Sequence, residues 1–320
     1  MKTACSVGRK VMVAHGHPRP MLRAAAAAAG SFDMPVTHVN DTAHVQVYID
    51  NSLPSDQATA LANQLLGQVE GAYLQNAGYF SPQLSQTPVI LVIAKLSAGS
   101  DGSGGAFHYG CDLTSGGTLY CDADFSDPTA TLGLFIAELD EAFQGDPSNP
   151  NQGWGCGFSN GEAHSRVAAF LASGGPHGSL AAFTTGPAWD QAGRPNWVDT
   201  TEQTDRNAIS TGCGMIFIDW LFSLGYNFPR ITQAAAPTLA GVYQNLTGSA
   251  TAWTDFTNAL ANVTISDDDP FHAYGNAMMI GGGLPGRRPA ASTAAASNGH
   301  VVIDPVKRTV VVPHGWLVQT

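Results

Sequence analysis

One stretch constrains the fold more than any other, because residues 88–96, PVILVIAKL, carry no polar residue before Lys95. An apolar run of this length is typical of a strand that is buried on both faces. Residues 44–50, HVQVYID, instead alternate apolar and polar positions, which predicts a second strand. Between them, residues 54–75 place apolar side chains at helical spacing and predict one surface helix. We therefore expect an α+β fold.

The second half of the chain is predicted to be mainly helical. Residues 128–144 follow a helical apolar pattern that ends at Gly145, and residues 159–172, SNGEAHSRVAAFLA, predict a further helix. Residues 211–224 are apolar almost all round the helix. We expect this last helix to be the most buried in the fold.

Size and charge divide the chain into three parts. A length of 320 residues suits one large domain with appendages, which we place at residues 37–283. The preceding residues 1–36 are rich in basic residues and include an alanine run, which predicts an export or processing segment or arm. Residues 284–320 combine a low-complexity linker with two valine-rich runs that predict a C-terminal β-hairpin. An exposed hairpin edge favours self-association.

The charge balance excludes several classes of partner. After the first 32 residues, 9 basic residues stand against 25 acidic ones. An acidic surface repels nucleic acid and anionic lipid, and it suits an extracellular or cation-binding protein. No apolar run reaches the roughly 18 residues that a membrane span needs. We therefore expect neither nucleic acid as a partner nor a membrane span.

The cysteine spacing predicts a framework of two disulfides. Cys111 and Cys121 flank DLTSGGTLY, whose Ser-Gly-Gly centre is typical of a hairpin turn, so we predict a bridge across paired strands. Cys156 and Cys213 each lie between two glycines near the start of a predicted helix, and we pair them by elimination, which leaves Cys5 free. Disulfides persist in oxidising compartments, so we expect a secreted, extracellular or periplasmic protein.

Three carboxylates gather near the end of the helix predicted over residues 128–144. Glu138 and Glu141 lie three residues apart on one side of it, whereas Asp140 points elsewhere. If buried, the two glutamates share a cation or a proton, and burial raises the pKa of one carboxyl. In the alternative, the helix emerges from the core after Leu139 and both glutamates are solvated.

Two more acidic residues are candidates for the same site. Glu162 either forms a capping box with Ser159 or belongs to the site, and in both cases it can pair with Arg166, one helical turn further on. Asp219 lies in the middle of the most apolar helix, where a carboxyl must be hydrogen-bonded, paired or protonated. Its expected partner is Arg166, Arg206 or the glutamate cluster.

The order of strand, helix, strand, edge hairpin and two glutamate-bearing helices resembles the zincin metallopeptidases, in particular the gluzincin branch, over about residues 37–225. In that family the first helix carries His-Glu-x-x-His, and a glutamate on the next helix completes the zinc ligands. Residues 137–141 read Ala-Glu-Leu-Asp-Glu, so only the general-base glutamate is kept, as Glu138. Glu141 and Glu162 take the places of the second and third ligands. The resemblance implies a small mixed sheet with an edge hairpin, packed on several helices.

The resemblance also bears on substrate and metal. His108 lies on the first strand of the predicted hairpin, where zincin edge strands hold substrate, although a lone strand histidine is also common on a polar surface. An all-carboxylate ligand set favours Ca, Mg or Mn, whereas Zn prefers nitrogen and sulfur ligands. The stretches GWGCGFSNGEAHSRVAAF and TDRNAISTGCGMIFIDWLFSLGY have the look of signature motifs of a secreted family.

Two functions follow from these patterns. The first is a secreted, metal-dependent hydrolase that acts on peptides or a related extracellular polymer, with Glu138 as general base and with Glu141 and Glu162 as ligands of a divalent cation. The supporting residues are Asp219, Arg166 and His108. The second is a catalytically inactive zincin-like scaffold that serves extracellular binding or assembly. Convergence of the three glutamates within about 5 Å in a cleft favours the hydrolase, and their separation onto solvent or into capping roles favours the scaffold.

Overall fold

The computed structural model describes residues 34–81, 88–96, 105–115 and 117–277, together with the backbone of residues 302–304 and 309–311. The chain divides into two units, Met1–Gly281 and Gly282–Thr320. The predicted export segment at residues 1–36, apart from its last three residues, lies outside the described residues, and so does the predicted linker.

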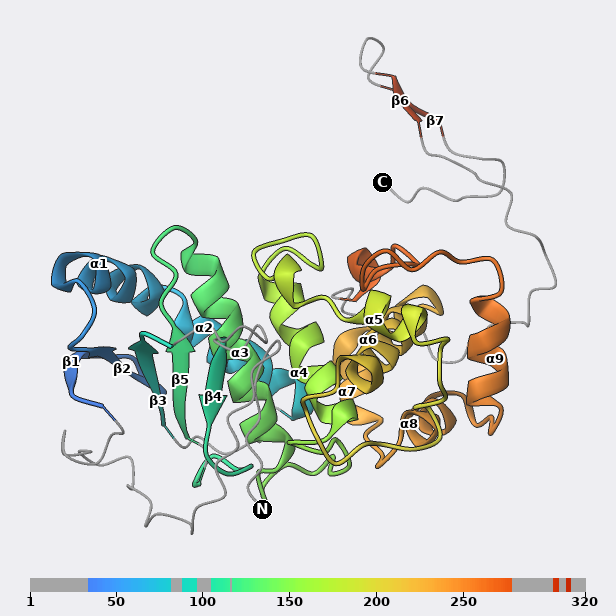
Figure 1. Ribbon diagram of the computed structural model, residues 1–320, viewed down its shortest axis with the longest axis horizontal. Helices are drawn as coiled ribbons and strands as arrows, with labels where there is room; N and C mark the ends of the chain where they lie inside the picture. The colour runs from blue at the N-terminus through green and yellow to red at the C-terminus, as the bar shows by residue number, and fades with distance from the viewer. Residues whose placement is uncertain are drawn as a thin grey trace. The chain divides into compact units, whose positions relative to one another are not determined.

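A mixed five-stranded sheet forms one part of the first unit (Figure 1). The strand order is β1-β2-β3-β5-β4, in which β2, β3 and β5 run parallel and β1 and β4 are antiparallel edge strands. The strands are β1 (Val36–Asp41), β2 (Val45–Asp50), β3 (Val89–Ala94), β4 (Ala106–His108) and β5 (Thr118–Asp122). The prediction of an α+β fold with a small mixed sheet is confirmed.

The central strand β3 is buried along its whole length, as its apolar sequence predicts. Leu91 and Ile93 belong to the main core, whereas Ile90 and Val92 belong to a second, smaller apolar cluster that also contains Tyr120. Because successive side chains of a strand point to opposite faces, both faces of the sheet are covered at β3. The helices pack on the face that belongs to the main core.

Residues predicted to form one surface helix form two, α1 (Ser55–Leu66) and α2 (Val69–Phe80). The break falls at Gly67, a residue type with low helix propensity, which ends α1. α1 packs against β1 and β2, whereas α2 packs mainly against α3 (Pro128–Gln144) and α7 (Phe228–Gln233). The two helices thus bury their apolar faces against different neighbours, which one straight helix cannot do.

Three long helices form the core beside the sheet, and α4 (Ser159–Ala172) packs between α3 and α6 (Ala208–Ser223) (Figure 1). α6 is buried from Ser210 to Phe222, as predicted. α3 is buried from Ala130 to Gln144, so its carboxylates do not emerge into solvent. The shorter helices are α5 (Gly186–Gln191), α8 (Leu239–Thr247) and α9 (Ala252–Ala259). None of the helices described here is long and apolar enough to cross a membrane.

Local sequence fixes both ends of α3. Pro128 occupies the first turn, where no N–H is needed, and the Asp127 carboxylate accepts a hydrogen bond from the Thr129 N–H at 3.1 Å. Gly145 ends the helix, and a Cβ at this position would overlap the carbonyl oxygen of Cys111. The end of α3 is therefore held directly against the loop that follows β4.

In the second unit, β6 (Val302–Asp304) pairs antiparallel with β7 (Thr309–Val311), and Val302 lies opposite Val311. These strands coincide with the two valine-rich runs. Self-association through this hairpin stays a prediction.

Candidate metal centre

Three glutamates from two adjacent helices are completely buried in the core. Glu138 and Glu141 lie one turn apart on α3, and Glu162 lies in the first turn of α4; all three have an exposed fraction of 0%. Because α3 and α4 pack side by side, Glu141 comes close enough to Glu162 for their charges to interact. The solvated helix end is therefore ruled out for α3.

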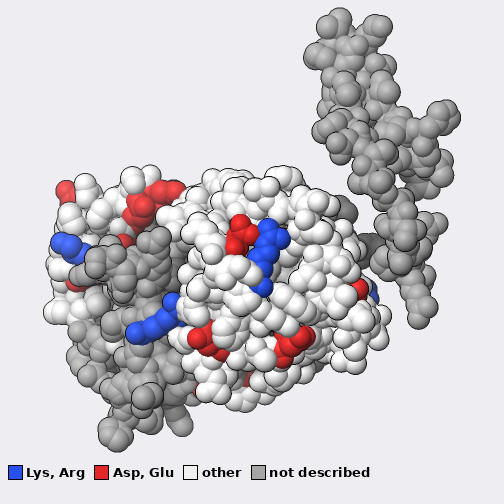
Figure 2. All heavy atoms as spheres, turned by 45° about the vertical axis from the view of Figure 1, so that its right-hand side comes forward, with Lys and Arg blue, Asp and Glu red and all other residues white. Residues whose placement is uncertain are grey.

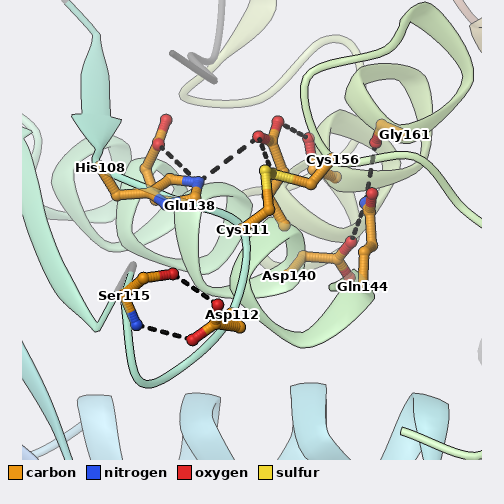
Figure 3. The surroundings of a disulfide bond; sticks show 11 residues. His108, Cys111, Asp112, Ser115, Glu138, Asp140, Gln144, Cys156 and Gly161 are labelled. Carbon is orange, nitrogen blue, oxygen red and sulfur yellow. Dashed lines mark hydrogen bonds and ion pairs between the residues drawn. A yellow bond between two sulfur atoms is a disulfide. The ribbon is translucent and has the colours of Figure 1, made fainter. Parts of the chain in front are cut away.

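His108 brings the edge strand β4 to the same place (Figure 3). Its Nε2 atom lies 3.8 Å from Glu138 Oε2 and 3.5 Å from Glu141 Oε2, and the imidazole is fully buried. Burial lowers the pKa of His108 to about 4, so the ring is neutral at pH 7. Nε2 has no hydrogen-bond partner among the described residues. The alternative, a histidine on the polar surface, is therefore wrong, and the ring points into the glutamate cluster.

Glu162 forms an ion pair rather than a helix cap. Arg166 Nε donates to Glu162 Oε1 at 2.6 Å, with both side chains buried, which confirms the predicted pairing. The capping box is absent, because the Ser159 N–H and hydroxyl bond to the backbone of Glu202 instead. On the other side, Ser165 Oγ donates to Glu141 Oε1 at 3.1 Å. Arg166 and Ser165 thus orient the two carboxylates toward each other.

Burial dominates the proton affinity of these carboxyls. The pKa of Glu141 is raised well above its ordinary value, first by burial and then by the negative charge of Glu162. The pKa of Glu162 is also raised by burial, although Arg166 opposes the shift. Asp205, buried nearby, has a pKa raised to about 8 by burial and by Glu162. Each of these groups takes up a proton or another positive charge more readily than an exposed carboxyl does.

Buried acids outnumber buried cations in the protein as a whole. Among the described residues, nine acidic side chains but a single arginine, Arg166, are buried. The buried acids are Asp50, Glu138, Asp140, Glu141, Asp146, Glu162, Asp205, Asp219 and Asp268. The face in Figure 2 accordingly shows only scattered charged side chains where it is described. Nine of the 25 acidic side chains of the sequence therefore lie inside the protein.

The disulfide pairing differs from both predicted bridges. Cys111 is bonded to Cys156, whereas Cys121 and Cys213 are free and buried. The hairpin prediction is wrong because Cys121 on β5 pairs in register with Ala106, so Cys111 lies beyond the end of β4 and not across the ladder. The second predicted bridge, between Cys156 and Cys213, follows by elimination from the first and is therefore also wrong.

The disulfide lies beside the glutamate cluster (Figure 3). Cys156 Sγ is 3.8 Å from Glu141 Oε2. One ligand atom each of His108, Glu141 and Cys156 lies within 4.8 Å of the others, which makes the group a candidate metal site. Because a disulfide sulfur carries no charge, His108 and Glu141 are the competent ligands among these three residues in the oxidised protein.

Asp140 belongs to a separate buried network that the sequence did not indicate. His164 Nδ1 lies 2.7 Å from Asp140 Oδ1, and His164 Nε2 lies 2.8 Å from Thr232 Oγ1. The imidazole is also stacked on Phe228, and Gln144 Nε2 donates to Asp140 Oδ1 at 2.9 Å. These contacts join α3, α4 and α7, and they direct Asp140 to a different side of α3 from the glutamate cluster.

Asp219 does not join the cluster and pairs with neither predicted arginine. Its Oδ2 atom accepts the Phe271 N–H at 2.9 Å, and its pKa is raised to about 8, mainly by burial. Asp268 likewise accepts hydrogen bonds from the backbone of Thr185 and Gly186. The acidic loop around Asp268 therefore anchors the chain to α5 and α6.

Comparison of the sequence with protein-family models and with curated proteins finds no match. The resemblance to zincins accordingly stays a prediction.

Proposed function

We propose that the protein is an exported, metal-dependent hydrolase of zincin-like type that acts on peptides or a related extracellular polymer. The observation that carries this proposal is the charge excess of the cluster. Among the described residues, Glu141, Glu162 and Asp205 are buried together with one guanidinium, that of Arg166. Buried carboxylates without a compensating charge cost several kcal/mol each. A divalent cation offsets this cost and uses the same oxygen atoms as ligands.

The ligands in this proposal are Glu141 and Glu162, joined by His108. The free Nε2 atom of His108 adds a nitrogen to the carboxylate oxygens. A nitrogen ligand shifts the preferred ion from Ca or Mg toward Mn or Zn. When bound, such an ion would polarise a water molecule and the carbonyl group of a substrate.

Glu138 is the proposed general base. It lies one helical turn before Glu141 on the same side of α3, and its Oε2 atom is 3.8 Å from His108 Nε2. A buried carboxylate accepts a proton readily because burial disfavours its charged form. Arg166 is a positioning residue in this account. It donates to Glu162 Oε1, whereas Glu162 Oε2 has no hydrogen-bond partner among the described residues and is the oxygen proposed to bind the cation.

Export is proposed on the basis of the Cys111–Cys156 disulfide, because such bonds persist in oxidising compartments. A peptide or extracellular polymer as substrate follows from that location and from the resemblance to peptidases.

A second function is favoured by one specific observation. Glu138, Glu141 and Glu162 have no exposed surface, and one oxygen of Glu162 is already occupied by Arg166. A scaffold that keeps the cluster neutral with protons, and that serves binding or assembly, fits this closed arrangement.

Turnover separates the two functions. The protein is loaded with zinc or manganese and incubated with a pool of quenched fluorescent peptides, with a chelator-treated sample in parallel. Cleavage that depends on the metal supports the hydrolase. A metal-loaded protein that cleaves nothing in the pool supports the scaffold.

A further inference from the structure

The Cys111–Cys156 disulfide lies beside two of the candidate ligands. Cys156 Sγ is 3.8 Å from Glu141 Oε2, and Glu141 Oε2 is 3.5 Å from His108 Nε2 (Figure 3). The sulfur, nitrogen and oxygen atoms all lie within 4.8 Å of one another. Three kinds of ligand atom that zinc accepts are therefore gathered around one point.

The second sulfur lies at the same point because it is bonded to the first. The Cα atoms of Cys111 and Cys156 are 5.7 Å apart. Two thiolates on a tetrahedral zinc, each about 2.3 Å from the ion, are about 3.8 Å from each other. Rotation of the two side chains can provide this separation without moving either backbone.

The two ends of the site differ in their access to solvent. Cys111 and Cys156 are partly exposed, whereas His108 and Glu141 are fully buried. The disulfide is therefore the least buried part of the site. His108 Nε2 has no hydrogen-bond partner among the described residues, so a metal ion can bind this atom without breaking a hydrogen bond.

We propose that reduction of the Cys111–Cys156 disulfide creates a zinc site with Cys111, Cys156, His108 and Glu141 as its four ligands. A dithiol reductant supplies two electrons and two protons; the S–S bond breaks, two thiols form, and the reductant is oxidised to its own disulfide. Zinc then binds the two sulfurs as thiolates, and their two protons pass to water. This site shares His108 and Glu141 with the cation site of the hydrolase proposal, so the two sites cannot be filled at the same time. The thiolate signal tests the reduced-chain site separately, because the hydrolase site contains no sulfur.

The test compares zinc uptake by the oxidised and reduced full-length chain. The protein is reduced with a phosphine, freed of reductant without oxygen, titrated with zinc alone and analysed for bound metal. Both forms use His108 and Glu141, so each should take up at most one equivalent there. The reduced chain should bind its zinc more tightly than the oxidised chain, because two thiolates add to the shared ligands. Cobalt in place of zinc should show the thiolate-to-metal charge-transfer absorption that an all-oxygen site lacks. Equal zinc affinity of the two forms, or a cobalt complex of the reduced chain without this absorption, would overturn the inference.

Variants test whether zinc binds to the proposed ligands or to another cysteine of the chain. Cys111→Ser and His108→Ala should each weaken zinc binding by the reduced chain at least about 100-fold, beyond the 10- to 100-fold effect of residues that only support a ligand. Cys213→Ser is the matched control, since Cys213 is a free, buried cysteine on α6, and it should bind zinc like the unmodified chain. Unchanged binding by Cys111→Ser would contradict the proposed ligand set.

A second readout needs no variant. Zinc should protect Cys111 and Cys156 of the reduced chain from alkylation by iodoacetamide, as mass spectrometry of the peptides can show. If reduction removes the helical circular dichroism signal, zinc should restore it, and failure to restore it counts against the site. Alkylation of both residues at the same rate with and without zinc would also contradict the proposal.

Discussion

His108 Nε2 lies 3.5 Å from Glu141 Oε2, and neither side chain has any exposed surface. The imidazole comes from an edge strand and the carboxylate from a core helix, so the contact depends on how β4 and α3 pack. The lowered pKa of His108 means that this ring offers a neutral nitrogen rather than a positive charge. His108 therefore adds a ligand atom for a metal ion, but it does not neutralise the negative charge of the carboxylates around it.

Replacing the proposed general base should remove activity without unfolding the protein. Glu138→Gln keeps the size of the side chain and removes its ability to accept a proton, so hydrolysis of the peptide pool should fall at least about 100-fold. The melting temperature should stay within a few degrees of that of the unmodified protein. Asp56→Asn, a change at an exposed position on α1, is the control and should leave turnover intact. Turnover that survives Glu138→Gln would show that another group is the base.

Removing the buried arginine should be strongly destabilising. Arg166→Met leaves Glu162 buried without its partner, and breaking a buried ion pair in this way costs about 3–5 kcal/mol. The double variant Arg166→Met, Glu162→Gln should cost less, because it buries no unpaired charge. Urea unfolding of Arg166→Met, of Glu162→Gln and of the double variant measures the difference. Additive costs would mean that the two side chains do not act as a pair.

Stability should fall as the pH rises toward 8. Asp219 has a pKa of about 8 in the folded protein, mainly because of burial, against about 3.9 in an unfolded chain. Between these values the folded chain binds more protons than the unfolded chain, so the free energy of unfolding decreases by up to about 1.4 kcal/mol per pH unit for one such group. Asp219→Asn should make the decrease shallower, as urea unfolding from pH 5 to pH 8 can show. If the free energy of unfolding of Asp219→Asn falls with pH as steeply as that of the exposed-site control Asp56→Asn, the raised pKa of Asp219 is contradicted.

The Asp140 network should support stability but not metal binding. His164→Phe removes both bonds at the ring nitrogens. Among the described residues this leaves Gln144 as the hydrogen-bond partner of the buried Asp140 side chain, so a cost of about 3 kcal/mol is expected. Bound metal per chain, measured under folding conditions, should not change. A loss of metal in His164→Phe at full folding would place Asp140 or His164 in the metal site.

Long periodic segments of the fold could be predicted from the sequence. The apolar run of β3 and the helical patterns of α3, α4 and α6 lie where they were expected, because burial of one face or of all faces leaves a clear pattern. The break between α1 and α2 could not be predicted in this way. The apolar stripe continues through Gly67, and only packing against different neighbours separates the two helices.

The candidate site was predictable only in part. The sequence indicates Glu138, Glu141 and the pairing of Glu162 with Arg166, since these depend on helical spacing. The approach of His108 and the bond between Cys111 and Cys156 depend on where β4 ends and how it meets α3. No local pattern contains that information.

The central claim is that the buried cluster holds a divalent cation, and the metal content of the purified protein tests it most directly. Elemental mass spectrometry should find about one equivalent of a divalent metal per oxidised chain, and Glu141→Gln should lose it. Removal of the metal with a chelator should lower the melting temperature. Metal-free protein whose melting temperature is the same with chelator and with added zinc or manganese would contradict the claim, and would mean that protons alone neutralise the cluster.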